Sequence, residues 1–222
     1  MSNTRKPNKP LKIYDFEKSG HAHRVRLMAS LLDLPYEAIP VDLLSGEQRT
    51  PAYLQLNPFG AVPVLDDDGV IVWDSTAILV YLAKKYGDET WLPNDPLGAA
   101  MVQRFLSLAS GEIFRGPCAA RLVTVFNVPL DHEASKAAAY KLFDILDDYL
   151  ADRAFLAAEH RTIADVACYS YIAHAPEGDV SLEKYHHIRA WLKRMEALPG
   201  FVAMPATKIC HVSRTVSHVK KF

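Results

Sequence analysis

The order of hydrophobic patterns in residues 11–87 restricts the fold of this chain more than any other feature. Residues 11–16 alternate apolar and polar side chains like a short strand, and residues 36–42 read as a second strand. Between them, residues 24–32 repeat apolar side chains at helical spacing, and the helix must end before Pro35 because proline cannot continue its hydrogen bonds. The sequence therefore predicts a strand–helix–strand unit whose two strands pair in parallel.

A second unit of two strands and one helix follows. Residues 62–65 and 70–73 are the predicted strands, joined by a hairpin turn. Asp74 and Ser75 then cap a helix that ends at Gly87. A small mixed sheet of this order, with a proline inside one strand, is typical of a thioredoxin-like α/β domain.

The rest of the chain is helical in pattern. Residues 88–97 lose periodicity and contain two prolines, which indicates a linker. Thr162 and Asp165 have the spacing of a capping box at a helix start, so we assign Asp165 a structural role. Helices are predicted over residues 98–114, 133–150, 163–174 and 185–198. The predicted organisation is a flexible arm (1–10), a thioredoxin-like domain (11–87), a linker (88–97), an all-helical bundle domain (98–204) and a basic tail (205–222).

Composition excludes several classes of function. The chain has 25 basic and 26 acidic side chains, which does not suit a nucleic-acid-binding surface. It has no apolar run of the about 20 residues that cross a membrane, and its polar start lacks a signal-peptide core, so we expect a cytoplasmic protein without membrane or nucleic-acid partners. The scattered Cys118, Cys168 and Cys210 form no metal-binding pattern, and the pair His21 and His23 lacks a third ligand, so we expect no metal.

The chain resembles the soluble glutathione transferases over almost its whole length, and three segments carry the resemblance. Residues 14–26, YDFEKSGHAHRVR, are similar to the active-site segment of the zeta class and related bacterial serine-type enzymes. Residues 57–65, NPFGAVPVL, followed by Asp74 and Ser75, resemble the glutathione-binding block of many classes, and TIADVA at 162–167 resembles their helical capping motif. The resemblance implies a glutathione-binding N-terminal domain, a helical domain that supplies the second-substrate pocket, and a homodimer.

The predicted glutathione-binding residues suit the chemistry of the tripeptide. Asp74 would pair with the γ-glutamyl ammonium, and Ser75, at a helix N-terminus, would bind the adjacent carboxylate. Val62 precedes Pro63 and must be extended, which leaves its backbone free to pair with the cysteinyl part like an added strand. The resemblance also implies a cis Val62–Pro63 bond and assigns Gln48 to the glycyl part. The alternatives are that Asp74 and Ser75 only cap a helix and that Gln48 lies in a solvated loop.

Ser19 aligns with the catalytic hydroxyl of the serine-type classes. Its hydroxyl would donate a hydrogen bond to the glutathione sulfur and favour the thiolate, and the alternative is that Ser19 only caps the following helix. Zeta relatives carry Ser-Ser-Cys where this chain has Ser19, Gly20 and His21, which argues against zeta-type maleylacetoacetate isomerase activity. His21 either takes part in activating the thiol or only lines the loop. We expect Arg24 to support the loop or helix.

The second-substrate pocket is expected between residues 19–23 and the first long helix of the C-terminal domain. Four side chains spaced by three or four residues can share one face of that helix, namely Arg104, Leu108, Glu112 and Arg115. An arginine in the pocket would suit an anionic or carbonyl-bearing substrate.

The sequence as a whole predicts a glutathione transferase, an enzyme that stabilises the thiolate of glutathione and passes it to a small electrophile, as in detoxification. The transfer would proceed by substitution, addition or peroxide reduction. Two alternatives stay open. One is a glutathione-dependent isomerase of the zeta type, and the other is a non-catalytic binding or regulatory module that keeps the fold.

Overall fold

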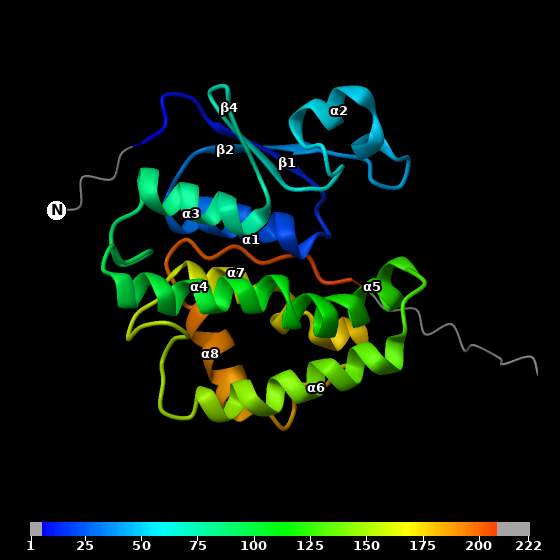
Figure 1. Cartoon of the computed structure of the whole chain (residues 1–222), viewed down its shortest axis with the longest axis vertical. Helices are drawn as coiled ribbons and strands as arrows, with labels where there is room; N and C mark the ends of the chain where they lie inside the picture. Colours follow the sequence, from blue (N-terminus) through cyan, green and yellow to red (C-terminus); the bar gives the residue numbers. More distant parts are fainter. Residues whose placement is uncertain (1–5, 208–222) are drawn as a thin grey trace, which may run out of the picture.

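The computed structural model describes residues 6–207, which form a small α/β layer beside a larger group of helices (Figure 1). Strand β1 (Leu11–Asp15) leads into helix α1 (Gly20–Leu31), and β2 (Tyr36–Pro40) pairs with β1 in parallel. The buried side chains of β1 alternate with more exposed ones, as expected for a strand with one face in the core. The predicted strand–helix–strand unit is confirmed.

The sheet has four strands in the order β2-β1-β3-β4. β3 (Val64–Asp67) runs antiparallel to β1, and β4 (Val70–Trp73) returns antiparallel to β3 through the predicted hairpin turn. Helix α3 (Ser75–Tyr86) follows at once, because Asp74 caps it by accepting hydrogen bonds from two backbone N–H groups of its first turn. This mixed sheet with its helices is the thioredoxin-like domain that the sequence predicts.

The two faces of the sheet are covered differently. Helices α1 and α3 lie between the sheet and the helical domain (Figure 1). On the other face, after the 3₁₀ turn η1 (Glu47–Arg49), helix α2 (Pro51–Leu56) packs Tyr53 against Val41 and Val64. Helix α1 therefore lies between the sheet and the helical domain, and its side chains can reach both.

The helical domain is built around α7 (Ile163–Ala173). Every side chain from Ile163 to Ile172 is buried, as expected for a helix at the centre of a domain. The other described elements here are α4 (Pro96–Ser110), the π-helical turn η2 (Phe114–Cys118), α5 (Ala119–Phe126), α6 (His132–Tyr149), the 3₁₀ turn η3 (Ala175–Gly178) and α8 (His186–Glu196). Within residues 6–207, no helix is both long and apolar enough to cross a membrane.

The predicted helix over residues 98–114 is wrong at its C-terminal end. Helix α4 stops at Ser110, and Gly111 leaves the helical conformation with φ −101° and ψ −93°. The chain then winds through η2, which contains Pro117, before α5 begins. Because proline lacks the N–H that a regular helix uses, the helical phase changes at this point. The sequence analysis did not predict α5.

The last described residues run back between the two domains (orange in Figure 1). The Nε2 atom of His23, on α1, bonds to the carbonyl of Val202 at 2.8 Å. This contact holds the segment against the thioredoxin-like domain. Of the predicted tail, residues 208–222 lie outside the described part of the chain, as do residues 1–5 of the predicted arm.

Asp165 is the buried centre of the capping box at the start of α7. Its carboxylate accepts hydrogen bonds from the backbone N–H groups of Thr162 (2.8 Å) and Leu156 (2.9 Å) and from the indole N–H of Trp191 (2.9 Å). Thr162 completes the box by accepting from the N–H of Ala164 at 3.2 Å. The structural role assigned to Asp165 is confirmed, and this carboxylate joins α7 to α8 and to the preceding loop.

Replacing this carboxylate is expected to destabilise the fold. Asp165→Asn puts an N–H₂ group where only acceptors fit, so we expect a loss of about 2–4 kcal/mol in the free energy of unfolding, measured with urea. Asp144→Asn is the matched control. Asp144 is half-exposed and accepts from Lys184 and Tyr185, both at 2.9 Å, so its change should cost less than about 1 kcal/mol. Equal costs for the two variants would contradict this account of Asp165.

Candidate active site

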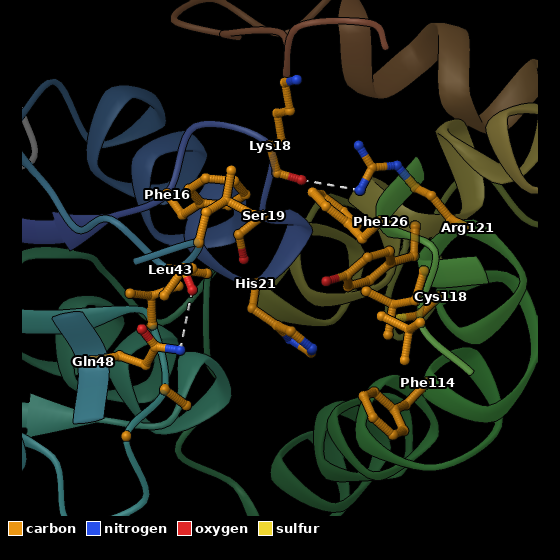
Figure 2. A pocket seen from close by; sticks show the side chains of 17 residues that line it. Phe16, Lys18, Ser19, His21, Leu43, Gln48, Phe114, Cys118, Arg121 and Phe126 are labelled. Atoms are coloured by element: carbon orange, nitrogen blue, oxygen red, sulfur yellow. Dashed lines mark hydrogen bonds between the residues drawn. The ribbon is translucent and has the colours of Figure 1, made fainter. Parts of the chain in front are cut away.

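A pocket of about 430 Å³ opens between the two domains (Figure 2). The thioredoxin-like domain contributes Phe16, Ser19 and His21 from the turn into α1, together with Gln48 and Val62. The helical domain contributes mostly apolar side chains, namely Phe114, Cys118, Arg121, Leu122, Phe126, Val128 and Tyr171. The pocket therefore brings the predicted thiol-activating residues opposite an apolar wall.

Ser19 stands at the turn from β1 into α1. Its Oγ atom accepts a hydrogen bond from the backbone N–H of Ala22 at 3.3 Å, which makes Ser19 the N-cap of α1. The same side chain lines the pocket. A hydroxyl that accepts one hydrogen bond still has its own proton to donate, so capping leaves Ser19 able to donate to a ligand. The two predicted roles of Ser19 are compatible.

The ring of His21 is directed into the pocket (Figure 2). It lies near Tyr171 and Phe114, with ring centroids 5.0 and 6.1 Å away. Its Nδ1 atom accepts a hydrogen bond from the guanidinium of Arg24 at 2.8 Å. Burial, and then the charge of Arg24, lowers the pKa of His21 to about 3. The imidazole is therefore neutral near pH 7.

Gly20 is fitted to the ring of Tyr171. A Cβ atom at Gly20 would lie 2.7 Å from Cζ of Tyr171, closer than such atoms approach in proteins. The Tyr171 ring is buried and packs against both His21 and Arg24. The space beside Ser19 is thus filled by an aromatic ring, which explains why the chain has no second serine there.

Two residues predicted to bind the cysteinyl and glycyl parts of glutathione line the pocket, Val62 and Gln48. The Val62–Pro63 peptide bond is cis, as the resemblance implies. Gln48 donates to the carbonyl of Leu43 at 3.4 Å, and its Oε1 atom is buried without a partner in the described part of the chain. A buried acceptor without a donor suits a site that an N–H group of a ligand completes.

Asp74 and Ser75 lie at the N-terminus of α3 and are not among the residues that line the pocket. Burial raises the pKa of Asp74, but its hydrogen bonds to the first turn of α3 outweigh burial and keep the pKa below its usual value. The Oγ atom of Ser75 accepts from Arg24 at 3.1 Å and lies 3.4 Å from Nδ1 of His21. The structure therefore brings Ser75 next to His21, and Asp74 carries a negative charge beside them.

The four residues predicted for the second-substrate pocket are not among those that line it. Arg104 contacts the sulfur of Met101 and is exposed. Glu112 and Arg115 form an exposed ion pair with a separation of 3.0 Å, and Leu108 packs against the core. The phase change after Ser110 ends the single helix that their spacing assumed, so Glu112 and Arg115 do not continue the face of Arg104 and Leu108.

The helical side of the pocket is lined by residues that the sequence analysis missed. Phe114, Cys118, Leu122 and Phe126 follow one another at intervals of four, which places them on one helical face. This spacing is the signal that could have identified them. Cys118 is buried, and burial raises the pKa of its thiol to about 11, so this cysteine stays protonated near pH 7.

Arg121 ties the helical wall to the loop that carries Ser19. It is buried, pairs with Glu177 at 2.6 Å and donates to the carbonyl of Lys18 at 2.9 Å. Its guanidinium also lies 5.6 Å from the ring centre of Phe126. Because Glu177 neutralises this charge, Arg121 positions the loop rather than offering a free cation to a ligand.

Side-chain clusters that could hold a metal ion are absent from the described part of the chain. Residues 6–207 contain no group of three or more His, Cys, Asp or Glu side chains that could hold a metal ion. Cys118 and Cys168 are buried free thiols, and Cys210 lies outside the described residues.

Comparisons with known proteins identify the family. Residues 19–85 match the family "Glutathione S-transferase, N-terminal domain", and residues 129–199 match "Glutathione S-transferase, C-terminal domain". A stretch of 114 residues, 51% of this chain and 51% of the relative, is 42% identical to a zeta-class glutathione S-transferase from Euphorbia esula.

Solved structures agree over most of the chain. A glutathione S-transferase from Pseudomonas fluorescens superposes with a TM-score of 0.83 at 32% identity, covering 88% of this chain and 99% of that one. A glutathione transferase homolog from Drosophila mojavensis, solved with bound glutathione, gives a TM-score of 0.77 at 30% identity, covering 86% and 89%. The chain belongs to the glutathione S-transferase family.

The fit of Gly20 to Tyr171 yields a stability prediction. Gly20→Ala drives a Cβ atom into the buried ring, so we expect a loss of about 1–3 kcal/mol in the free energy of unfolding, measured with urea. In a Tyr171→Leu background, where the shorter side chain leaves room, the same change should cost clearly less. An equal cost in both backgrounds would mean that the ring does not exclude a side chain at position 20.

Proposed function

We propose that this protein activates the thiol of glutathione in the pocket between its domains and transfers it to a small hydrophobic electrophile. The observation that carries the proposal is the pairing of two walls. One wall has Ser19, His21 and Val62, and the other is apolar and aromatic. A role in detoxification and a cytoplasmic location belong to the same proposal.

The tripeptide would lie along the end of the sheet. The free backbone of Val62 pairs with the cysteinyl part as an added strand would, and Gln48 meets the glycyl part. The N-terminus of α3 favours the γ-glutamyl carboxylate at Ser75, and the ionised Asp74 favours the neighbouring ammonium. This arrangement directs the cysteinyl thiol toward Ser19.

Thiol activation is the chemical step that Ser19 would assist. A free thiol has a pKa of about 8.5 and is mostly protonated at neutral pH. A hydrogen bond from the Ser19 hydroxyl to the sulfur stabilises the thiolate, and the released proton goes to solvent. The thiolate then attacks the electrophilic atom of the second substrate. In a substitution the leaving group departs with its bonding electrons, and in an addition the resulting carbanion takes up a proton from solvent.

The second substrate is expected to be apolar rather than anionic. The wall that would contact it carries aromatic and aliphatic side chains, including Phe114, Leu122 and Phe126. The charge of Arg121 is already neutralised by Glu177. Substitution or addition on a hydrophobic electrophile therefore suits the pocket better than recognition of a carboxylate.

Calorimetric titration with glutathione tests the proposal most simply. We expect binding with a dissociation constant below about 1 mM, and turnover with at least one electrophile of an aromatic panel. No binding at millimolar concentration would contradict the proposal. Binding without turnover across the panel would favour the alternative of a non-catalytic module.

Substitutions at Ser19 and Ser75 should affect different quantities. Ser19→Ala removes a donor to the sulfur, so kcat/KM should fall by about 10- to 1000-fold with little change in glutathione affinity, and Ser19→Thr is the control that keeps a hydroxyl. Ser75→Ala removes a donor to a ligand carboxylate, so glutathione binding should weaken by about 1–3 kcal/mol. An unchanged rate in Ser19→Ala would leave Ser19 only as a helix cap.

A homodimer is part of the proposal, and a pair of exposed aromatic rings supports it. Phe59 is 76% exposed and contacts Trp73 in a tilted arrangement, 5.1 Å between ring centres, beside the exposed Val70 and Ile71 of β4. Light scattering should find a dimer at micromolar concentration, and Phe59→Glu should convert it to a monomer. Ile145→Glu, on α6, is the control: it changes an exposed apolar side chain outside this patch and should leave the dimer intact. A wild-type monomer would contradict the dimer.

A further inference from the structure

Arg24 is a buried cation without a buried anion. The residue is 1% exposed, and no carboxylate among residues 6–207 forms an ion pair with it, although the charge of Asp74 acts on it from a distance. Its Nη1 atom donates to Nδ1 of His21 at 2.8 Å and to Oγ of Ser75 at 3.1 Å, and its Nη2 atom donates to the carbonyl of Ala109 at 3.5 Å. The Nε atom has no partner in the described residues. Burial lowers the pKa of Arg24, yet a guanidinium stays protonated inside proteins.

The contact with Arg24 determines where His21 carries its proton. A guanidinium only donates, so Nδ1 of His21 must be the accepting nitrogen. The hydroxyl of Ser75, 3.4 Å from the same nitrogen, is the other polar group beside it. A neutral imidazole whose Nδ1 accepts has its proton on Nε2, so the ring has one defined tautomer.

The Nε2 atom of His21 is left for a ligand. It has no hydrogen-bond partner among residues 6–207 and is not among their buried unsatisfied atoms, and the ring lines the pocket together with Ser19 and Val62 (Figure 2). The charged groups that act on the ring are Arg24 and Asp74, while its ring neighbours Phe114 and Tyr171 are uncharged near pH 7. The N–H donor is thus fixed in direction and lies on the same wall as the Ser19 hydroxyl.

We propose that Arg24 is a positioning residue that holds His21 in the Nε2–H tautomer, so that the ring offers a second hydrogen-bond donor to the sulfur of bound glutathione. The inference rests on the proposed function, because it assigns a partner to that sulfur. The thiolate would also bring a negative charge to within one imidazole ring of the guanidinium, which has no ion-pair partner of its own. A donor of this kind would replace the second hydroxyl for which Tyr171 leaves no room.

The tautomer is measured first, on the unliganded protein with ¹⁵N-labelled histidine. NMR spectra that correlate ring nitrogens with ring protons distinguish the Nε2–H, Nδ1–H and charged forms, and His21→Asn identifies the signal. We expect the Nε2–H form in the wild type and loss of the pure tautomer in Arg24→Met, which removes the donors but keeps an apolar side chain of similar length. An Nδ1–H ring in the wild type would overturn the proposal.

The second measurement is the apparent pKa of the thiol of bound glutathione, followed by thiolate absorbance. His21→Gln keeps an N–H donor at the position of Nε2, whereas the amide of His21→Asn reaches only the position of Nδ1. We expect His21→Asn and Arg24→Met to raise the thiol pKa by about one unit and lower kcat/KM by about 10- to 100-fold. Affinity for glutathione should change less than about threefold in His21→Asn, whereas Arg24→Met also removes a donor to Ser75 and should weaken binding. His21→Gln should retain most of the wild-type rate.

Failure of this inference and failure of the proposed function give different results. If the wild type does not bind glutathione, both proposals fail. If it binds glutathione with a lowered thiol pKa, and that pKa is unchanged in His21→Asn, the proposed function stands and the role of His21 and Arg24 is wrong. The His21→Asn result decides the matter even if Arg24→Met does not fold, because His21 lies at the pocket surface.

Discussion

The buried guanidinium of Arg24 is the interaction on which the arrangement of the site depends. From α1 it bonds to Ser75 at the start of α3 and to the carbonyl of Ala109 on α4, and it lies 5.5 Å from the ring centre of Tyr171 on α7. A single side chain therefore connects the thioredoxin-like side of the pocket with the helical domain. Because a buried cation without an ion-pair partner is costly, a negative charge bound in the pocket would stabilise it.

The departures from the zeta-type motif belong together physically. Tyr171 fills the space beside Ser19, which requires glycine at position 20. The same ring packs against His21 at 5.0 Å and so helps to hold the imidazole toward the pocket. The similarity to a zeta-class enzyme over about half of the chain is thus combined with a different set of groups near the predicted position of the sulfur. An aromatic wall opposite them favours hydrophobic substrates.

Local patterns predicted the thioredoxin-like domain well, because strand alternation, helix caps and turns are encoded by neighbouring residues. Residues 70–73 and the capping by Asp74 are examples. The helical wall of the pocket was missed because the predicted helix was continued past Gly111, where α4 ends, so the pocket face was placed on α4 and not on residues 114–126. A supporting role for Arg24 was predicted and agrees with its contact to His21, but its other partners could not be predicted, since Ser75 and Ala109 lie 51 and 85 residues away in sequence.

Proton release on glutathione binding tests the central claim, thiolate stabilisation in this pocket, most directly. Calorimetric titrations at neutral pH, repeated in buffers with different ionisation enthalpies, give the number of protons released per bound ligand. The account predicts release of most of one proton with glutathione, because the bound thiol ionises, and none with S-methylglutathione, which has no thiol proton. Glutathione that binds without releasing a proton, or that behaves like its S-methyl derivative, would contradict it.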